Sequence, residues 1–196
     1  TLRNCVVSYR GGAQSRGGLA LVGVSKQTTF LQAGTSTGPP RPIPFQFSIT
    51  QGYVLEFGDL YLRFIFQGGY VTETPIAITA ATKANPCVLS VVNTFANGDW
   101  VFVSGVGGMT QLNGNTYIVA GVTGTTFQLH DLNGVAVNSS AFTTYTSGGT
   151  VARLYTVVTP YAAADLPYLK FAQSADLMSL SCSNPITGSE YPPYDL

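Results

Sequence analysis

The feature that most constrains the fold is a run of alternating large apolar residues between positions 45 and 72. Residues 53–57 and 60–66 carry such side chains at every second position, and Gly58-Asp59 separates the two runs. Because successive side chains of a strand point to opposite faces, each run has one apolar face. These faces consist of Tyr53, Leu55 and Phe57 on the first run, and of Leu60, Leu62, Phe64 and Phe66 on the second. Two such runs around a short turn predict a β-hairpin, which Gln67-Gly68-Gly69 extends into a three- or four-stranded antiparallel meander.

Proline limits the rest of the outer chain. Four prolines fall within residues 39–44, so we expect residues 34–44 to form a loop and exclude a helix or a central strand there. The best helical candidate lies within residues 155–178, where Pro167 restricts it to one or two turns. The segment Asp176–Cys182 is predicted to be a strand, and the prolines beyond it indicate a loose end.

Residues 80–152 have the pattern of a separate unit. Asn-Gly dipeptides at positions 97–98, 113–114 and 133–134 divide short apolar runs. These runs are Val88–Val92, Trp100–Ser104, Thr116–Val122, Thr126–Leu129 and Thr150–Tyr155. Five short strands at this spacing predict a small β-barrel or sandwich, with Trp100 filling its core. The whole chain is therefore predicted to be all-β: an antiparallel β-sheet platform from residues 1–79 and 153–196, an inserted small β-barrel at 80–152, and one short helix.

Charge is scarce in this sequence. It has nine Lys and Arg and nine Asp and Glu, and charged residues make up 9% of 196 positions, against about 25% in a typical soluble domain. The balance excludes a free-standing basic DNA-binding protein, and the apolar content excludes a disordered tail. With no apolar stretch near 18 residues, the chain is not expected to span a membrane. Zero net charge favours association with partner subunits, although a neutral polar surface would also account for it.

The sequence offers no recognisable catalytic constellation. Gly34-Thr35-Ser36-Thr37-Gly38 matches a nucleophile-elbow pattern, but prolines follow it where that motif requires a helix. The single histidine, His130, is expected to end a strand, and the carboxylates do not cluster; Glu56 and Asp59 are expected to face solvent. The sequon at Asn138 is expected to be a plain polar loop. We therefore predict no enzymatic activity, no catalytic or metal-binding residues and no cofactor.

Three cysteines, Cys5, Cys87 and Cys182, are far apart in the sequence. No Cys-x-x-Cys pattern indicates a zinc or redox site. Free buried thiols are the default expectation, and a Cys5–Cys182 disulfide remains open.

The segments outside residues 80–152 resemble the tail nozzle-type (tail tubular) structural proteins of tailed bacteriophages. The similar stretches are 43–59, 159–166, 169–176 and Tyr191-Pro192-Pro193, with a looser match at Arg3-Asn4 and the glycine-rich loop around Arg16. The chain lacks the Gly-Gly-Glu segment of that family and stops soon after Tyr-Pro-Pro, so the family's distal domains are not carried over.

This resemblance implies a virion structural protein of the tail, assembled in the host cytoplasm. Identical subunits would form a cyclic ring, typically a hexamer, that contacts portal or adaptor proteins and tail fibre proteins without membrane insertion. Double-stranded DNA would pass through the ring during ejection, and few cations would suit passage because each neutralised phosphate adds affinity. The candidate lumen or intersubunit contacts are Arg3, Arg10, Arg16, Arg41 and Arg63.

The alternative is a carbohydrate-binding or adhesin-like tail fibre or receptor-binding β protein. Eleven Tyr and eleven Phe favour it, but those at 45–72 have the spacing of core residues. The middle unit has its own resemblance, through Asn97-Gly98-Asp99, Leu112-Asn113-Gly114 and Thr126-Phe127. It resembles a small barrel inserted in phage virion proteins and is similar to the first catalytic cysteine half-domain of ubiquitin-activating enzymes. Since Cys87 has no activating partner nearby, we interpret the unit as a binding or spacer barrel.

Overall fold

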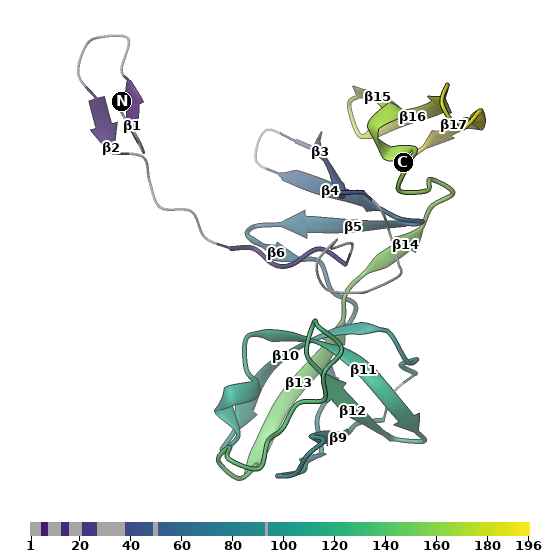
Figure 1. Cartoon of the computed structure of the whole chain (residues 1–196). Coiled ribbons are helices and arrows are strands. Elements are labelled where there is room, and N and C mark those ends of the chain that lie inside the picture. The colour runs from purple at the N-terminus through teal and green to yellow at the C-terminus, as the bar shows by residue number, and fades with distance from the viewer. Residues whose placement is uncertain (1–4, 8–12, 16–20, 27–37, 49–50, 93) are drawn as a thin grey trace.

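The chain is all-β, as predicted. The structure is a computed structural model that describes residues 5–7, 13–15, 21–26, 38–48, 51–92 and 94–196 (Figure 1). Strands make up 52% of it and helix about 4%, with no helix of seven or more residues. The first two strands, β1 (Cys5–Val7) and β2 (Ala13–Ser15), form an antiparallel pair. Within the described residues no helix is long and apolar enough to cross a membrane.

The predicted meander forms the platform, a sheet with the strand order β14-β5-β4-β3. Its strands are β3 (Arg41–Gln46), β4 (Gly52–Gly58), β5 (Tyr61–Phe66), β6 (Gly69–Tyr70), which pairs with β5, and β14 (Thr156–Val158). The hairpin turn is shifted by one residue from the prediction: Leu60 takes a φ of 59° and leaves the strand, so it does not share the face of Leu62.

The prediction of a loop at residues 34–44 is wrong for positions 41–44, which belong to strand β3. Pro42 and Pro44 alternate along β3, so the two positions that lack an N–H lie on the same side of the strand. Because β3 is the edge of the sheet, that side needs no partner.

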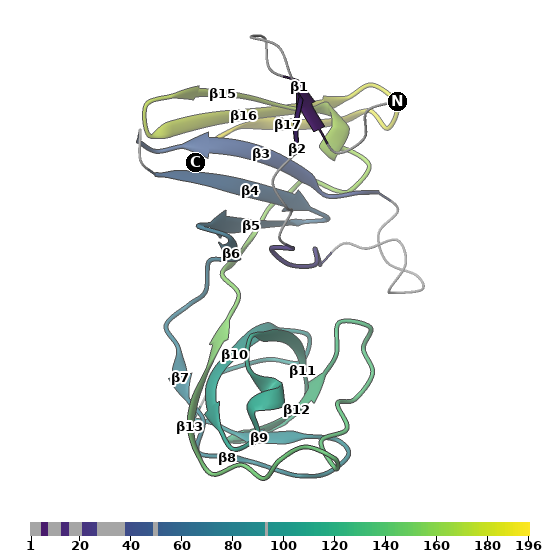
Figure 2. The ribbon, with the colours of Figure 1, turned by 90° about the vertical axis from the view of Figure 1, so that its left-hand side faces the viewer.

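The second sheet curls into the barrel and has the order β7-β13-β10-β11-β12-β9-β8 (Figure 2). Its strands are β7 (Ile76–Ala77), β8 (Ala80–Ala81), β9 (Val88–Ser90), β10 (Trp100–Gly107), β11 (Asn115–Thr123), β12 (Thr126–His130) and β13 (Ser147–Arg153), with a 3₁₀ turn η1 at Thr110–Leu112. Each of the five predicted runs overlaps one strand of this sheet, from β9 to β13. The core is filled by side chains such as Leu89, Met109 and Phe127. Trp100 is buried but lies outside this core, at the end of the barrel nearest the platform, contrary to prediction.

A three-stranded sheet covers the platform from the side opposite to the barrel (Figure 1). It consists of β15 (Leu169–Ser174), β16 (Leu177–Asn184) and β17 (Ser189–Asp195). The predicted strand at 176–182 is confirmed as β16, whereas the expected loose end is the edge strand β17. The helical candidate is a single 3₁₀ turn, η2 (Leu166–Tyr168). Cys87 and Cys182 are free and buried, which rules out the Cys5–Cys182 disulfide.

Candidate functional site

One face of the platform is apolar and only partly covered. Its inner half packs with the C-terminal sheet in a common core that includes Leu55, Phe57, Leu62 and Met178. The remainder forms an open groove with a volume of about 400 Å³. The groove is lined by Phe45, Tyr53, Leu55, Phe64, Val71, Tyr155 and Leu196. The groove is therefore an exposed continuation of the core.

Aromatic contacts and the chain end shape this groove. Tyr53 stacks on Phe66 with ring centroids 4.8 Å apart, and Phe64 lies 5.6 Å from Tyr155. Leu196 is fixed at the end of the groove because its backbone exchanges two hydrogen bonds with Met178, at 3.1 and 2.9 Å. Tyr155 and Leu196 remain 45% and 39% exposed. The alternation read from the sequence predicted the apolar face but not that part of it stays open.

The opposite face of the platform carries buried charge. Glu56 is 6% exposed and Arg63 is 2% exposed, and the two residues are paired across β4 and β5. Tyr61 donates a hydrogen bond of 2.8 Å to one oxygen of the Glu56 carboxylate, and the Tyr70 hydroxyl donates to the other. The expectation that Glu56 faces solvent is wrong because residues 21–26 pack on this face, where the Tyr70 hydroxyl contacts the Val24 carbonyl at 3.5 Å.

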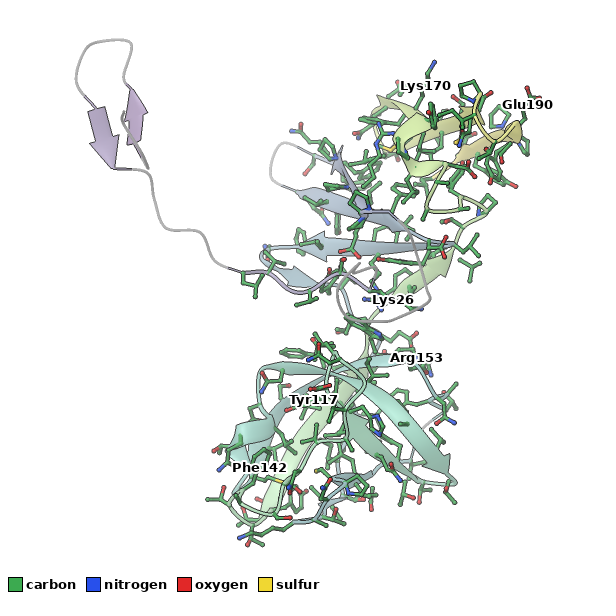
Figure 3. All side chains as sticks on the ribbon, viewed as in Figure 1. Lys26, Tyr117, Phe142, Arg153, Lys170 and Glu190 are labelled. Carbon is green, nitrogen blue, oxygen red and sulfur yellow. The ribbon has the colours of Figure 1, made fainter. Side chains whose placement is uncertain are left out.

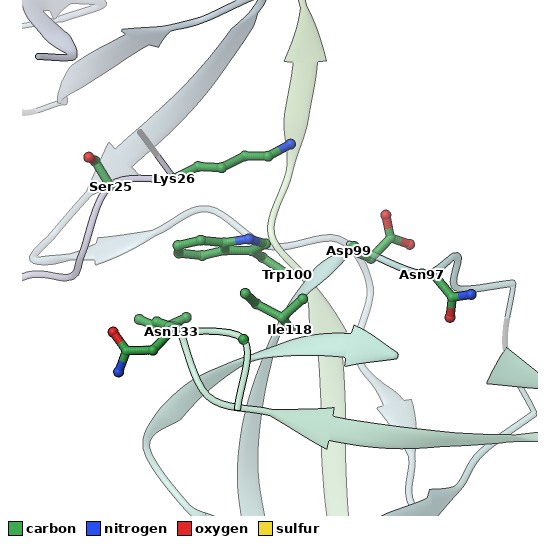
Figure 4. Close-up of a pocket in the computed structure, with 10 residues that line it drawn as sticks. Ser25, Lys26, Asn97, Asp99, Trp100, Ile118 and Asn133 are labelled. Carbon is green, nitrogen blue, oxygen red and sulfur yellow. The ribbon is translucent and has the colours of Figure 1, made fainter. Parts of the chain in front are cut away.

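Arg63 joins the platform to the barrel. Its guanidinium lies 4.5 Å from the ring centre of Trp100, and its Nε donates to the Thr156 hydroxyl at 3.2 Å. Figure 4 shows the Trp100 indole between the Lys26 side chain on one side and Ile118 on the other. Burial, and after it the charge of Arg63, lower the pKa of Lys26. Two cations therefore approach each other around one aromatic ring.

A third cation, Arg153, links the two connections between platform and barrel (Figure 3). Its guanidinium lies 3.0 Å from Asp99 and 3.7 Å from Glu73, and it donates a hydrogen bond of 2.9 Å to the Thr94 carbonyl. Alongside, the Glu73 amide donates to the Arg153 carbonyl at 2.8 Å. Two adjoining cavities of about 380 and 240 Å³ open at this junction, and both are lined by Lys26, Asp99 and Trp100.

Of the five arginines singled out from the sequence, the structure describes Arg41 and Arg63, which have different surroundings. Arg3, Arg10 and Arg16 lie outside the described residues. Arg41 donates to the carbonyls of Leu166 and Pro167 at 2.7 and 3.1 Å, which anchors the C-terminal segment to the platform. Arg63 is buried within its own chain, which corrects its assignment to a surface contact. Lys26, Trp100 and Arg153, which lie with Arg63 around the junction, were not identified from the sequence.

The other candidate groups have structural surroundings. The His130 ring Nδ1 lies 2.9 Å from the Gly134 carbonyl, in the turn after β12. Burial raises the pKa of the Cys87 thiol and, as the largest of several causes, that of Cys182. Ser139, within the sequon, is fully buried and donates to the carbonyls of Thr82 and Ala84. In the described part of the chain, no group of three or more His, Cys, Asp or Glu could hold a metal ion.

Asp165 is the most tightly held carboxylate of the C-terminal unit and is 2% exposed. Burial alone would raise its pKa, but hydrogen bonds from Tyr191, Asn184 and Thr187 outweigh burial, and the pKa lies below its ordinary value. The bonds from Tyr191 and Asn184 measure 2.6 and 2.7 Å. This carboxylate therefore locks the turn η2 to β16 and β17.

Comparison with known proteins assigns one part of the chain. Residues 85–154 match the family model of the ubiquitin-activating enzyme E1 FCCH domain, which agrees with the resemblance noted for the middle unit. The match covers the barrel strands β9 to β13 and less than half of the chain. No curated protein matches the sequence. The family found is not a phage tail nozzle family, so the predictions of a nozzle subunit and of a tail-fibre protein are wrong. Over its barrel, the chain is similar to the E1 FCCH domain.

Proposed function

We propose that this chain is a non-catalytic structural subunit that associates with other copies of itself through the apolar groove of the platform. The observation that carries the proposal is the groove itself: an open stretch of core-like surface lined by four aromatic side chains, Phe45, Tyr53, Phe64 and Tyr155. Aromatic residues in such pockets dominate the energy of protein interfaces. Of the partners expected from the sequence, the proposal retains identical copies.

Charge favours a second copy as the occupant of the groove. The chain has a net charge of zero and few charged residues, so two copies approach without the repulsion that keeps many proteins apart. Among the other exposed apolar side chains, Val158 and Ile186 lie outside the groove. Leu21 and Val22 line a larger pocket of about 840 Å³, but its lining also includes polar residues such as Asn115 and Asp131. The groove is therefore the best candidate for the contact.

The surroundings of the chemically reactive groups support a role without catalysis. The thiols of Cys87 and Cys182 are buried and held in their neutral form, and His130 is occupied in a turn. A nucleophilic thiol needs a lowered pKa, whereas the pKa values of these two thiols are raised.

Analytical ultracentrifugation over a range of concentrations tests the proposal. The wild-type chain is expected to associate reversibly, and Tyr155→Lys is expected to weaken association about tenfold or more, because it buries an unpaired charge in the contact. Ile186→Lys is the matched control, since Ile186 is 81% exposed and lies away from the groove. A wild-type chain that stays monomeric at every concentration contradicts the proposal. Equal loss in both variants contradicts the assignment to the groove.

A further inference from the structure

The smaller junction cavity contains a hydrogen-bond donor without an acceptor. It measures about 240 Å³, and its lining includes Lys26, Arg63, Glu73, Asp99, Trp100 and Arg153. Arg63 is only 2% exposed, yet its Nη1 has no hydrogen-bond partner among the described residues. A buried guanidinium nitrogen without a partner has lost its hydration with no hydrogen bond to offset the loss. An acceptor in the cavity would offset this loss.

The carboxylates around the cavity are already engaged. Both oxygens of Glu56 accept tyrosine hydroxyls, as described above. Asp99 accepts the amide of Ala96 at 2.8 Å and lies beside Arg153, and Glu73 also lies beside Arg153. Both ion pairs found among the described residues are formed by Arg153, with Glu73 and with Asp99. Neither Arg63 nor Lys26 forms an ion pair within that part of the chain.

Lys26 supplies the second donor. It lines the same cavity, and its ammonium nitrogen lies 5.7 Å from the ring centre of Tyr61, which the Arg63 guanidinium approaches at 5.4 Å. The charge of Arg63 adds to burial in lowering the pKa of Lys26, and the charge of Asp99 offsets this only in part. A planar guanidinium and a mobile ammonium together fit an oxyanion.

We infer that the junction cavity is a binding site for a small oxyanion, a phosphate or a carboxylate group, held between Arg63 and Lys26 beside Trp100. This site is separate from the apolar groove and independent of the proposed self-association. The Thr156 hydroxyl accepts from Arg63 Nε and so fixes the guanidinium at the lining of the cavity. Binding joins residues 21–26 to the platform and the barrel and thereby stiffens the junction.

Trp100 is the single tryptophan of the chain and lines the cavity, so its fluorescence reports on the junction. The full chain is titrated with inorganic phosphate, with acetate and, at matched ionic strength, with chloride. We expect phosphate or acetate to cause a saturable change in Trp100 fluorescence, and chloride to cause none. The anion that causes the change shows whether the site prefers a phosphate or a carboxylate group. Lys26→Gln is expected to weaken this binding about tenfold, and Lys170→Gln, an exposed lysine of β15, is expected to leave it unchanged.

Arg63→Lys provides a second variant, which keeps the positive charge but removes the forked donor. It is expected to bind at least tenfold more weakly, while far-ultraviolet circular dichroism stays that of the wild type. A linear, unsaturable response to both oxyanions overturns the inference. An unchanged affinity in Lys26→Gln overturns it as well.

Discussion

The buried carboxylate of Glu56 permits a sharp test of how the platform is stabilised. Glu56→Gln keeps the shape of the side chain and removes its charge. The carboxylate accepts hydroxyls from Tyr61 and Tyr70 and faces Arg63 across the strand pair. A hydrogen bond to a charged group contributes about 1.5–3 kcal/mol, against about 1 kcal/mol for a neutral one. Weakening two such bonds therefore costs about 1–4 kcal/mol.

The loss of the counter-charge gives a second estimate of the same cost. Removing one member of a buried charged pair destabilises by about 3–5 kcal/mol where the pair is in direct contact. Glu56 and Arg63 are register partners without a direct ion pair, so we take the lower part of that range. We expect Glu56→Gln to lower the free energy of unfolding by about 2–4 kcal/mol, measured by urea denaturation.

Glu73→Gln is the matched control, since the chemical change is identical. Glu73 contacts Arg153 at 3.7 Å and its side chain is 42% exposed, so its removal should cost about 0–1 kcal/mol. The double variant Glu56→Gln/Arg63→Met should cost less than the sum of its two single variants, because both charges are then removed. If Glu56→Gln costs no more than Glu73→Gln, or if the double variant is additive, the reasoning about a buried charged cluster is refuted.

Three further predictions concern the cores and the titratable groups. Because the pKa of Asp165 is lowered in the folded chain, the ionised carboxylate stabilises the fold above about pH 4, and this stabilisation is lost as the pH falls further. Asp165→Asn should therefore lower the free energy of unfolding at neutral pH, and urea denaturation should show a smaller loss of stability on acidification than in the wild type. Phe127→Ala, at a fully buried position of the barrel core, should cost about 3–5 kcal/mol by the same assay. Cys87 and Cys182 should resist iodoacetamide in the folded chain and react after unfolding, as peptide mass spectrometry would detect; rapid labelling of the native chain would contradict their burial.

The parts of the fold that local pattern determines were predicted from the sequence. The hairpin of β4 and β5 follows from strict alternation around a short turn, and the barrel strands follow from apolar runs between Asn-Gly turns. The strands β3 and β17 were missed because their prolines were taken as loop signals. Both are edge strands, and the prolines of β3 lack N–H groups only on its outer side. In β17, Pro192 and Pro193 fall at the register shift between Leu180 and Cys182, where the ladder with β16 is interrupted. The alternation Arg41-x-Ile43-x-Phe45 was the signal that could have identified β3.

The junction could not be predicted from local pattern, because its members come from four distant segments. Lys26, Arg63, Trp100 and Arg153 meet only after the chain has left the platform at β6, completed the barrel and returned through β13 to β14. Each of these residues has an ordinary sequence context. Trp100 in particular has the context of a core residue of β10, and it contacts Arg63 because it sits at the first position of that strand, at the barrel's end.

The neighbouring positions Glu56 and Phe57 explain where the platform differs from an ordinary half-exposed sheet. They point to opposite faces of β4, yet they are 6% and 0% exposed. Alternation alone would bury one of them and expose the other, so each face must have its own cover. The C-terminal sheet covers Phe57, and residues 21–26 with the tyrosines Tyr61 and Tyr70 cover Glu56. A charged residue inside an otherwise apolar hairpin therefore indicates a second buried face, and its charge requires partners from elsewhere in the chain.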